Sequence, residues 1–105
     1  MIVTFEKEYL LDLYEKGKTN DKKHRFQLEI IRKYKLCIMA LLSAENIEEL
    51  FTIHSLNYKV LQGDKKGISS IRVNTQYRIE FTVKSEGIEP VITICNILEL
   101  SNHYK

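Results

Sequence analysis

Residues 68–84 read ISSIRVNTQYRIEFTVK, and their pattern predicts a β-hairpin. Apolar and polar side chains alternate along residues 77–84, which is the period of a strand with one buried face. An extended segment at residues 68–73 precedes this strand, and the Asn-Thr-Gln between them at 74–76 is typical of a tight turn. The stretch therefore predicts two antiparallel strands.

The register of this hairpin follows from the requirement that the apolar side chains of both strands share the core. It pairs Val73 with Tyr77 and places Arg72 opposite Arg78 on the other face. Two facing like charges are destabilising unless an anion compensates them. Glu80 supplies that anion in one interpretation, as a structural ion pair. In the other, the arginine pair binds a phosphate, which the planar guanidinium fits well.

Helical periodicity precedes the hairpin. Apolar residues recur at steps of three and four over residues 9–14, a run that ends at Gly17, and again over residues 26–42. Ser43 is a suitable cap for a further short helix over residues 47–51. We therefore expect two or three helices before the hairpin.

Strand-like segments lie on both sides of these helices. Residues 2–5 predict a short first strand, residues 58–62 an extended segment, and residues 91–95, apolar on both faces, an interior strand before a tail at 98–105. The order predicts an α+β fold, in which an N-terminal strand and two to three helices pack on a three- to four-stranded antiparallel sheet.

Composition indicates one domain over residues 1–105, with 44% hydrophobic residues and a net charge of +2. The longest apolar run, residues 36–42, is too short to cross a bilayer, and the start lacks the apolar core of a secretory signal. We therefore expect a cytoplasmic protein without membrane contact. Cys37 and Cys95 lie in apolar stretches and are predicted to be buried free thiols.

The charges are sorted along the sequence. Residues 16–35 contain eight basic and two acidic residues, a balance of +6, and residues 59–78 contain five basic and one acidic, a balance of +4. A segregated positive surface suits a phosphate backbone or an acidic protein partner. The first segment is also typical of a solvated helix face.

Residues 102–105, Asn-His-Tyr-Lys, add a histidine and a phenol to this basic chain. RNA cleavage by a 2′-hydroxyl needs a base, cations that stabilise the phosphorane, and an acid for the leaving oxygen. This chemistry needs no metal ion, and the sequence offers neither a metal cluster nor a cofactor motif. The candidates for these roles are Arg72, Arg78, Lys59, His103 and Tyr104.

Three segments resemble the RelE/ParE superfamily of toxins, and within it most closely the HigB branch. They are LQGDKKG at 61–67, SIRVN at 70–74 and QYRIEF at 76–81. These segments are similar to the Leu-Lys-Gly-Asp turn, the Ser-Ile-Arg-Val strand and the Trp/Tyr-Arg-Ile-x-Phe strand of the family. The resemblance implies the same α+β fold over the whole chain.

The resemblance also implies roles for individual residues. Arg78 would stabilise the scissile phosphate, and Arg72 would be a basic contact on the neighbouring strand. Lys59 stands where HigB-like toxins often place a histidine, and His103 would be the counterpart of the histidine in their Asp-Tyr-His tail. The catalytic set is then Arg78, His103, Lys59 and Tyr104, and the RNA-binding set is Arg72, Lys65, Lys66 and Asn102.

The family implies a bacterial type II toxin that cleaves translated mRNA in the ribosomal A site. Its partners would be the ribosome, mRNA and a cognate HigA-like antitoxin with a helix-turn-helix domain, and it would need no cofactor. Two alternatives remain on the same scaffold. One is a non-enzymatic poison of DNA gyrase of the ParE kind, and the other is a degenerate module that retains only antitoxin binding.

Overall fold

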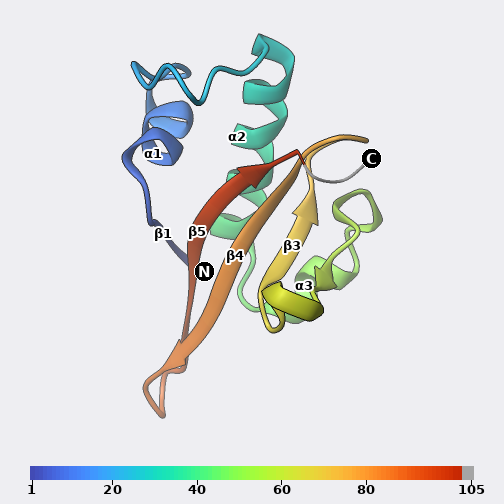
Figure 1. Cartoon of the computed structure of the whole chain (residues 1–105). Coiled ribbons are helices and arrows are strands. Elements are labelled where there is room, and N and C mark those ends of the chain that lie inside the picture. The colour runs from blue at the N-terminus through green and yellow to red at the C-terminus, as the bar shows by residue number, and fades with distance from the viewer. Residues whose placement is uncertain (103–105) are drawn as a thin grey trace.

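The predicted hairpin forms the middle of a five-stranded sheet in a computed structural model that describes residues 1–102. The strand order is β1-β5-β4-β3-β2, and helix α2 lies behind the sheet in Figure 1. The strands are β1 (Ile2–Phe5), β2 (Lys59–Val60), β3 (Ser69–Arg72), β4 (Arg78–Glu86) and β5 (Ile92–Ser101). The helices are α1 (Glu8–Glu15), α2 (Leu28–Ser43) and α3 (Ile47–Phe51), with single 3-10 turns η1 (His54–Leu56) and η2 (Gly63–Lys65).

The hairpin between β3 and β4 has the predicted register. The Val73 amide donates a 2.9 Å hydrogen bond to the Tyr77 carbonyl, and Arg72 pairs with Arg78. Ile71 and Ile79 pair in the next position, are fully buried and face the helices. Alternation along the two strands therefore separates an apolar core face from a polar face.

The sheet has one more strand than expected. Strands β5, β4, β3 and β2 are antiparallel, as predicted, whereas β1 adds a fifth strand that runs parallel to β5 and pairs Val3 with Cys95. Part of the expected tail also belongs to β5, which continues to Ser101. The Asn96 side chain of β5 bonds to the β1 side of the sheet: its Oδ1 accepts a 2.8 Å hydrogen bond from the Thr4 hydroxyl, and its Nδ2 donates a 2.8 Å hydrogen bond to Glu6.

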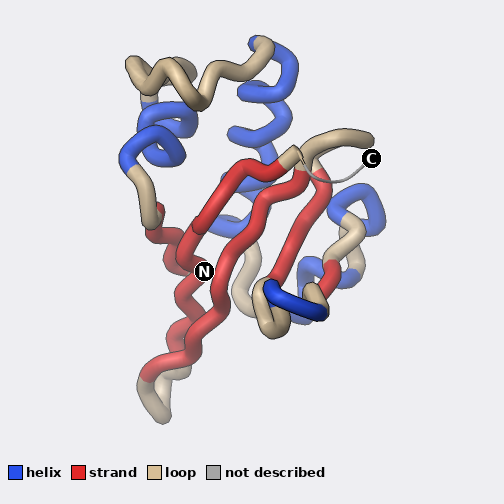
Figure 2. Tube along the Cα trace, viewed as in Figure 1, coloured by secondary structure: helices blue, strands red, loops and turns tan. Residues whose placement is uncertain are grey.

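The hairpin between β4 and β5 extends beyond the helices (Figure 2). Its side chains Val83, Val91 and Ile92 are consequently exposed, although the alternating pattern places Val83 on the core face. The interior position predicted for residues 91–95 is correct for Cys95, which is fully buried between β1 and β4. Val91 and Ile92 are exposed, contrary to this prediction, because none of the described helices covers that end of the hairpin (Figure 2).

The helices follow the predicted periodicity, but their bounds differ: α2 begins at Leu28, so residue 26 of the predicted stripe precedes it, and α3 has another cap than expected. Tyr34 and Leu41 of α2 are fully buried on the stripe that the sequence indicates. Helix α3 is capped by Asn46 rather than by Ser43, since Ser43 is still the last residue of α2. The Asn46 side chain accepts a 3.1 Å hydrogen bond from the Glu49 amide.

Cys37 and Cys95 are both buried and free, as predicted. Burial raises the pKa of each thiol to about 11, so both remain protonated at neutral pH. Within the described part of the chain, no helix has the length and apolar character that a bilayer crossing requires.

Candidate functional site

The sheet face that the core does not use carries two rows of polar side chains. Residues paired directly across strands project to the same face, so the register defines both rows. The first row is Arg72, Arg78 and Ser101, and the second is Lys59, Ser70, Glu80 and Glu99. The two rows bring together the basic residues of β2, β3 and β4, which are separated in sequence.

Arg78 is fixed in place by its hydrogen bonds. It is only 4% exposed, and its Nε donates a 2.5 Å hydrogen bond to the Ser70 Oγ. Its Nη2 donates to the carbonyl oxygens of Asn57 at 2.6 Å and Ser70 at 3.1 Å. Because three bonds hold its planar group, the orientation of the Arg78 guanidinium is set before any ligand arrives.

Arg72 is the exposed member of the pair. Its Nε donates a 3.2 Å hydrogen bond to the Asn74 carbonyl, which turns the side chain back toward the hairpin loop. Arg72 and Arg78 line one pocket of about 220 Å³, together with Asn57, Asn74 and Thr75. Two guanidinium groups at one pocket form a site suited to a phosphate group.

Glu80 forms an ion pair with Lys65, whose ammonium lies 2.9 Å from the carboxylate. The Glu80 side chain is 3% exposed, whereas that of Lys65 is 38% exposed. A buried carboxylate needs such a partner because its desolvation is costly. The ion pair considered from the sequence joined Glu80 to the arginine pair, whereas the structure shows Lys65 as a partner of Glu80.

The other predicted residues are placed as follows where the structure describes them. Lys66 is exposed beside the η2 turn, and Asn102 is exposed directly after Ser101, which pairs with Arg78. Lys59 is exposed on β2 and lines a second, larger pocket of about 450 Å³. His103 and Tyr104 lie outside the described residues, so their proposed roles stay predictions.

Residues that sequence reasoning missed line this second pocket. They include Phe51, His54 and Asn57. Asn57 lines both pockets and has a left-handed backbone with φ of 42°. Asn is one of the few non-glycine residue types that adopt this conformation readily, which was the one available signal. The sequence pattern was misleading for Phe51, because its helical spacing from the other apolar residues of 47–51 predicts a buried side chain.

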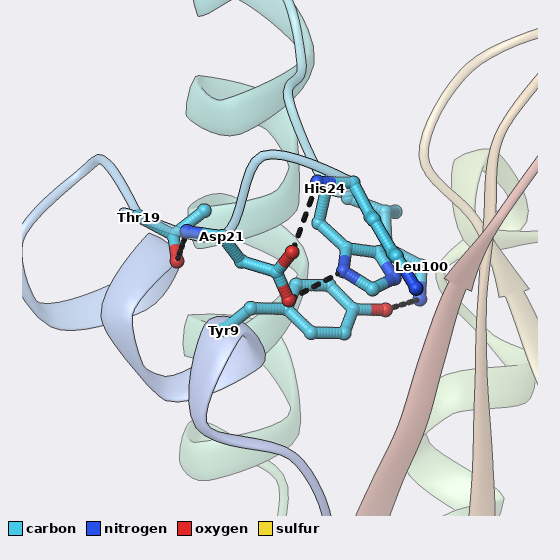
Figure 3. Close-up of polar contacts among 6 residues, drawn as sticks. Tyr9, Thr19, Asp21, His24 and Leu100 are labelled. Atoms are coloured by element: carbon cyan, nitrogen blue, oxygen red, sulfur yellow. Dashed lines mark hydrogen bonds and ion pairs between the residues drawn. The ribbon is translucent and has the colours of Figure 1, made fainter.

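A separate polar cluster fastens the connection between α1 and α2 (Figure 3). The rings of Tyr9 and His24 stack with centroids 3.7 Å apart, and the His24 Nδ1 lies 2.8 Å from an Asp21 carboxylate oxygen. The Leu100 amide donates a 3.4 Å hydrogen bond to the Tyr9 hydroxyl. Burial raises the pKa of Tyr9 to about 12, so the phenol stays neutral and the cluster is a structural tie to β5.

Comparison with known proteins shows the family to which this chain belongs. The model of a family described as "RelE-like toxin of type II toxin-antitoxin system HigB" matches residues 3–92, a range that includes both arginines. No curated protein matches the sequence. A solved YoeB/ParE toxin from Agrobacterium tumefaciens has the same fold, with a TM-score of 0.55 at 18% identity over 99% of this chain and 100% of that one. The chain therefore belongs to the HigB-like family of RelE-like toxins from type II toxin–antitoxin systems.

Proposed function

We propose that this toxin is a ribosome-dependent endoribonuclease that cleaves translated mRNA without a metal ion. The observation that carries the proposal is the convergence of Arg72 and Arg78, paired across β3 and β4, on one pocket. Fixed cationic donors stabilise charge that develops on a phosphate in the transition state, which is the largest contribution in many enzymes. Membership of a toxin family supports a target whose loss stops growth.

In the proposed reaction, the 2′-hydroxyl of one nucleotide attacks its own 3′-phosphate. The 2′ oxygen forms a bond to phosphorus, the bond from phosphorus to the 5′ oxygen breaks, and the products are a 2′,3′-cyclic phosphate and a 5′-hydroxyl end. Arg78 stabilises the phosphorane and Arg72 holds the phosphate. A base removes the proton of the attacking hydroxyl, and an acid protonates the leaving oxygen. The candidates for these proton transfers are His103, Tyr104 and Lys59.

The remaining basic and polar residues of this face contact RNA in this proposal. Lys66 and Asn102 are exposed, and Lys65, the chain neighbour of Lys66 in the η2 turn, pairs with Glu80. The type II family implies a cognate antitoxin. We propose a HigA-like partner with a helix-turn-helix domain, whose acidic or amphipathic segment covers the arginine pair or the basic surface of residues 16–35 by charge complementarity. A target on translating ribosomes places the reaction in the cytoplasm.

The test is induced expression in a bacterial host, with mapping of mRNA 5′ ends and of their 5′-hydroxyl chemistry. Arg72→Gln removes one cation from the pocket at an exposed position, and Arg32→Gln on the exposed side of α2 is its matched control. We expect growth arrest with new 5′-hydroxyl ends inside codons for the natural chain and for Arg32→Gln. Arg72→Gln should reduce cleavage roughly 10- to 100-fold, as expected for the loss of a charge-assisted hydrogen bond.

Other outcomes separate the alternatives. Growth arrest with intact mRNA would contradict the nuclease and favour a gyrase poison. Normal growth together with tight binding of the antitoxin would indicate a module that only binds its partner.

A further inference from the structure

Phe51 presents an aromatic ring to solvent beside the candidate site. It is 55% exposed at the end of α3, and its ring centroid lies 5.0 Å from that of Tyr58. Tyr58 is itself anchored, since its hydroxyl lies 2.6 Å from the Ser69 Oγ and its ring packs edge-on against Phe81. Phe51 therefore rests on a fixed support, and the rest of its ring is open to a ligand.

The pocket at this ring combines aromatic, imidazole and cationic groups. It has a volume of about 450 Å³, against about 220 Å³ for the arginine pocket, and Phe51, His54, Tyr58 and Lys59 are among its lining residues. Unstacked RNA bases bind by stacking on such rings, and lysines contact the neighbouring phosphates. Ile53 and Val60 complete the apolar part of the lining. A nucleotide uses the rings for its base and the lysine for its phosphate, whereas an uncharged peptide segment would leave the cation unused.

Asn57 joins this pocket to the arginine pair. It lines both pockets, and its carbonyl oxygen accepts the 2.6 Å hydrogen bond from Arg78. The left-handed backbone at Asn57 turns the chain between η1 and β2, and Tyr58, the next residue, lines the larger pocket. The Arg78 side chain, which belongs to the phosphate site, therefore also holds the Asn57 turn at the edge of the aromatic pocket.

We propose that this pocket binds the nucleobase adjacent to the scissile phosphate, with Phe51 as the stacking surface that sets base preference. The inference rests on the proposed function, because it takes the phosphate between the arginines as the point of cleavage. His54 and Lys59 border the bound nucleotide, and neither is required as an acid or a base for this role.

The experiment measures binding of the toxin to ribosomes programmed with a non-cleavable mRNA, which carries a 2′-deoxy nucleotide at the cut site. Each position of the A-site codon is replaced in turn by an abasic residue. The natural chain is compared with Phe51→Leu, which removes the ring, and with Phe51→Tyr, which keeps it. Ile88→Ala, an exposed apolar substitution in the turn between β4 and β5, is the control for surface changes.

We expect Phe51→Leu to weaken binding of the intact mRNA roughly 5- to 100-fold, the range for loss of one base-stacking contact. For the natural chain, an abasic residue at one codon position should cause a similar loss. The same abasic residue should cause little further loss with Phe51→Leu, because the two changes remove the same contact. Phe51→Tyr and Ile88→Ala should bind like the natural chain.

Unchanged affinity of Phe51→Leu would overturn the inference. So would a result in which the fold-losses of Phe51→Leu and of the abasic residue multiply at every codon position. Failure of the natural chain to bind the programmed ribosome would overturn it as well. The proposed function is tested separately with an all-ribose mRNA. Binding with the expected Phe51 dependence but without cleavage of that mRNA would refute the nuclease and leave the base pocket in place.

Discussion

The Lys65 ammonium lies 2.9 Å from the carboxylate of Glu80, a side chain that is buried among the strands. Lys65→Met would leave this carboxylate buried without that cation. We expect a loss of about 2–4 kcal/mol in the free energy of unfolding. This loss is smaller than for a fully buried ion pair because solvent partly screens the exposed Lys65 side chain. Urea denaturation measures it.

The matched control for this variant is Lys66→Met, which removes an exposed neighbouring lysine and should change stability by less than about 0.5 kcal/mol. Adding Glu80→Gln to Lys65→Met should restore part of the loss, since the charge is then gone. Equal stability of the Lys65 and Lys66 variants would show that the ion pair contributes little to the fold.

Arg78 and Arg72 should respond differently to removal. Arg78→Ala deletes three hydrogen bonds to Ser70 and Asn57 and leaves a gap in a buried position, so we expect a loss of about 2–4 kcal/mol in unfolding free energy. Arg72→Ala at an exposed position should cost less than about 0.5 kcal/mol. Denaturation midpoints of the purified variants, with m-values, measure both effects.

A consequence for activity assays follows. Under the proposed function, loss of toxicity in Arg78→Ala would combine a folding defect with a catalytic one, whereas loss in Arg72→Ala would report on the pocket alone. Similar stability of the two variants would contradict the scaffolding role of Arg78.

The pH dependence of stability should contain a contribution from Asp21. The hydrogen bond with His24, and then the one with the Lys23 amide, lower the pKa of Asp21 below its ordinary value. A lowered folded-state pKa stabilises the fold above the unfolded pKa of about 3.9, and this contribution disappears as pH falls through the folded pKa. Asp21→Asn should therefore lower the urea midpoint near pH 6 and make progressively less difference below about pH 4.

Glu15→Gln, at an exposed position on α1, is the control for removal of one carboxylate. The urea midpoints of Asp21→Asn and of the natural chain should converge as the pH falls. A gap between them that widens toward acidic pH would contradict this assignment.

Asn57 should tolerate glycine better than alanine. Its φ of 42° is open to glycine, but a Cβ without a compensating polar group costs about 1 kcal/mol or more in this region. We expect Asn57→Ala to be less stable than Asn57→Gly and to weaken RNA cleavage more, because Arg78 is bonded to the backbone carbonyl of this turn. Thermal unfolding and cleavage assays of both variants test the order, and a more stable Asn57→Ala would refute it.

Local patterns were sufficient for the hairpin and its arginines. Alternation along residues 77–84 fixes which side chains share a face, and a three-residue turn then leaves one register, with Arg72 opposite Arg78. The pairing of β1 with β5 could not be predicted, because it joins residues about ninety positions apart and no local signal specifies a parallel partner.

The second pocket was missed for a related reason. Phe51, His54 and Asn57 lie in short segments, and Asn57 is held by a hydrogen bond from Arg78, a residue 21 positions later. Exposure of Phe51 follows from Leu50, which takes the buried position of the five-residue helix α3. Periodicity over so few residues does not distinguish the two side chains.

The position of β5 has a consequence for when the protein can be made active. Of the described strands, β5 is the last to be synthesised, yet it lies between β1 and β4 and closes the sheet. A nascent chain that ends before Ile92 holds β1 without its partner, and the row that begins with Arg72 and Arg78 lacks Ser101. The described sheet, and with it the full row of Arg72, Arg78 and Ser101, can therefore assemble only after its last strand has been synthesised.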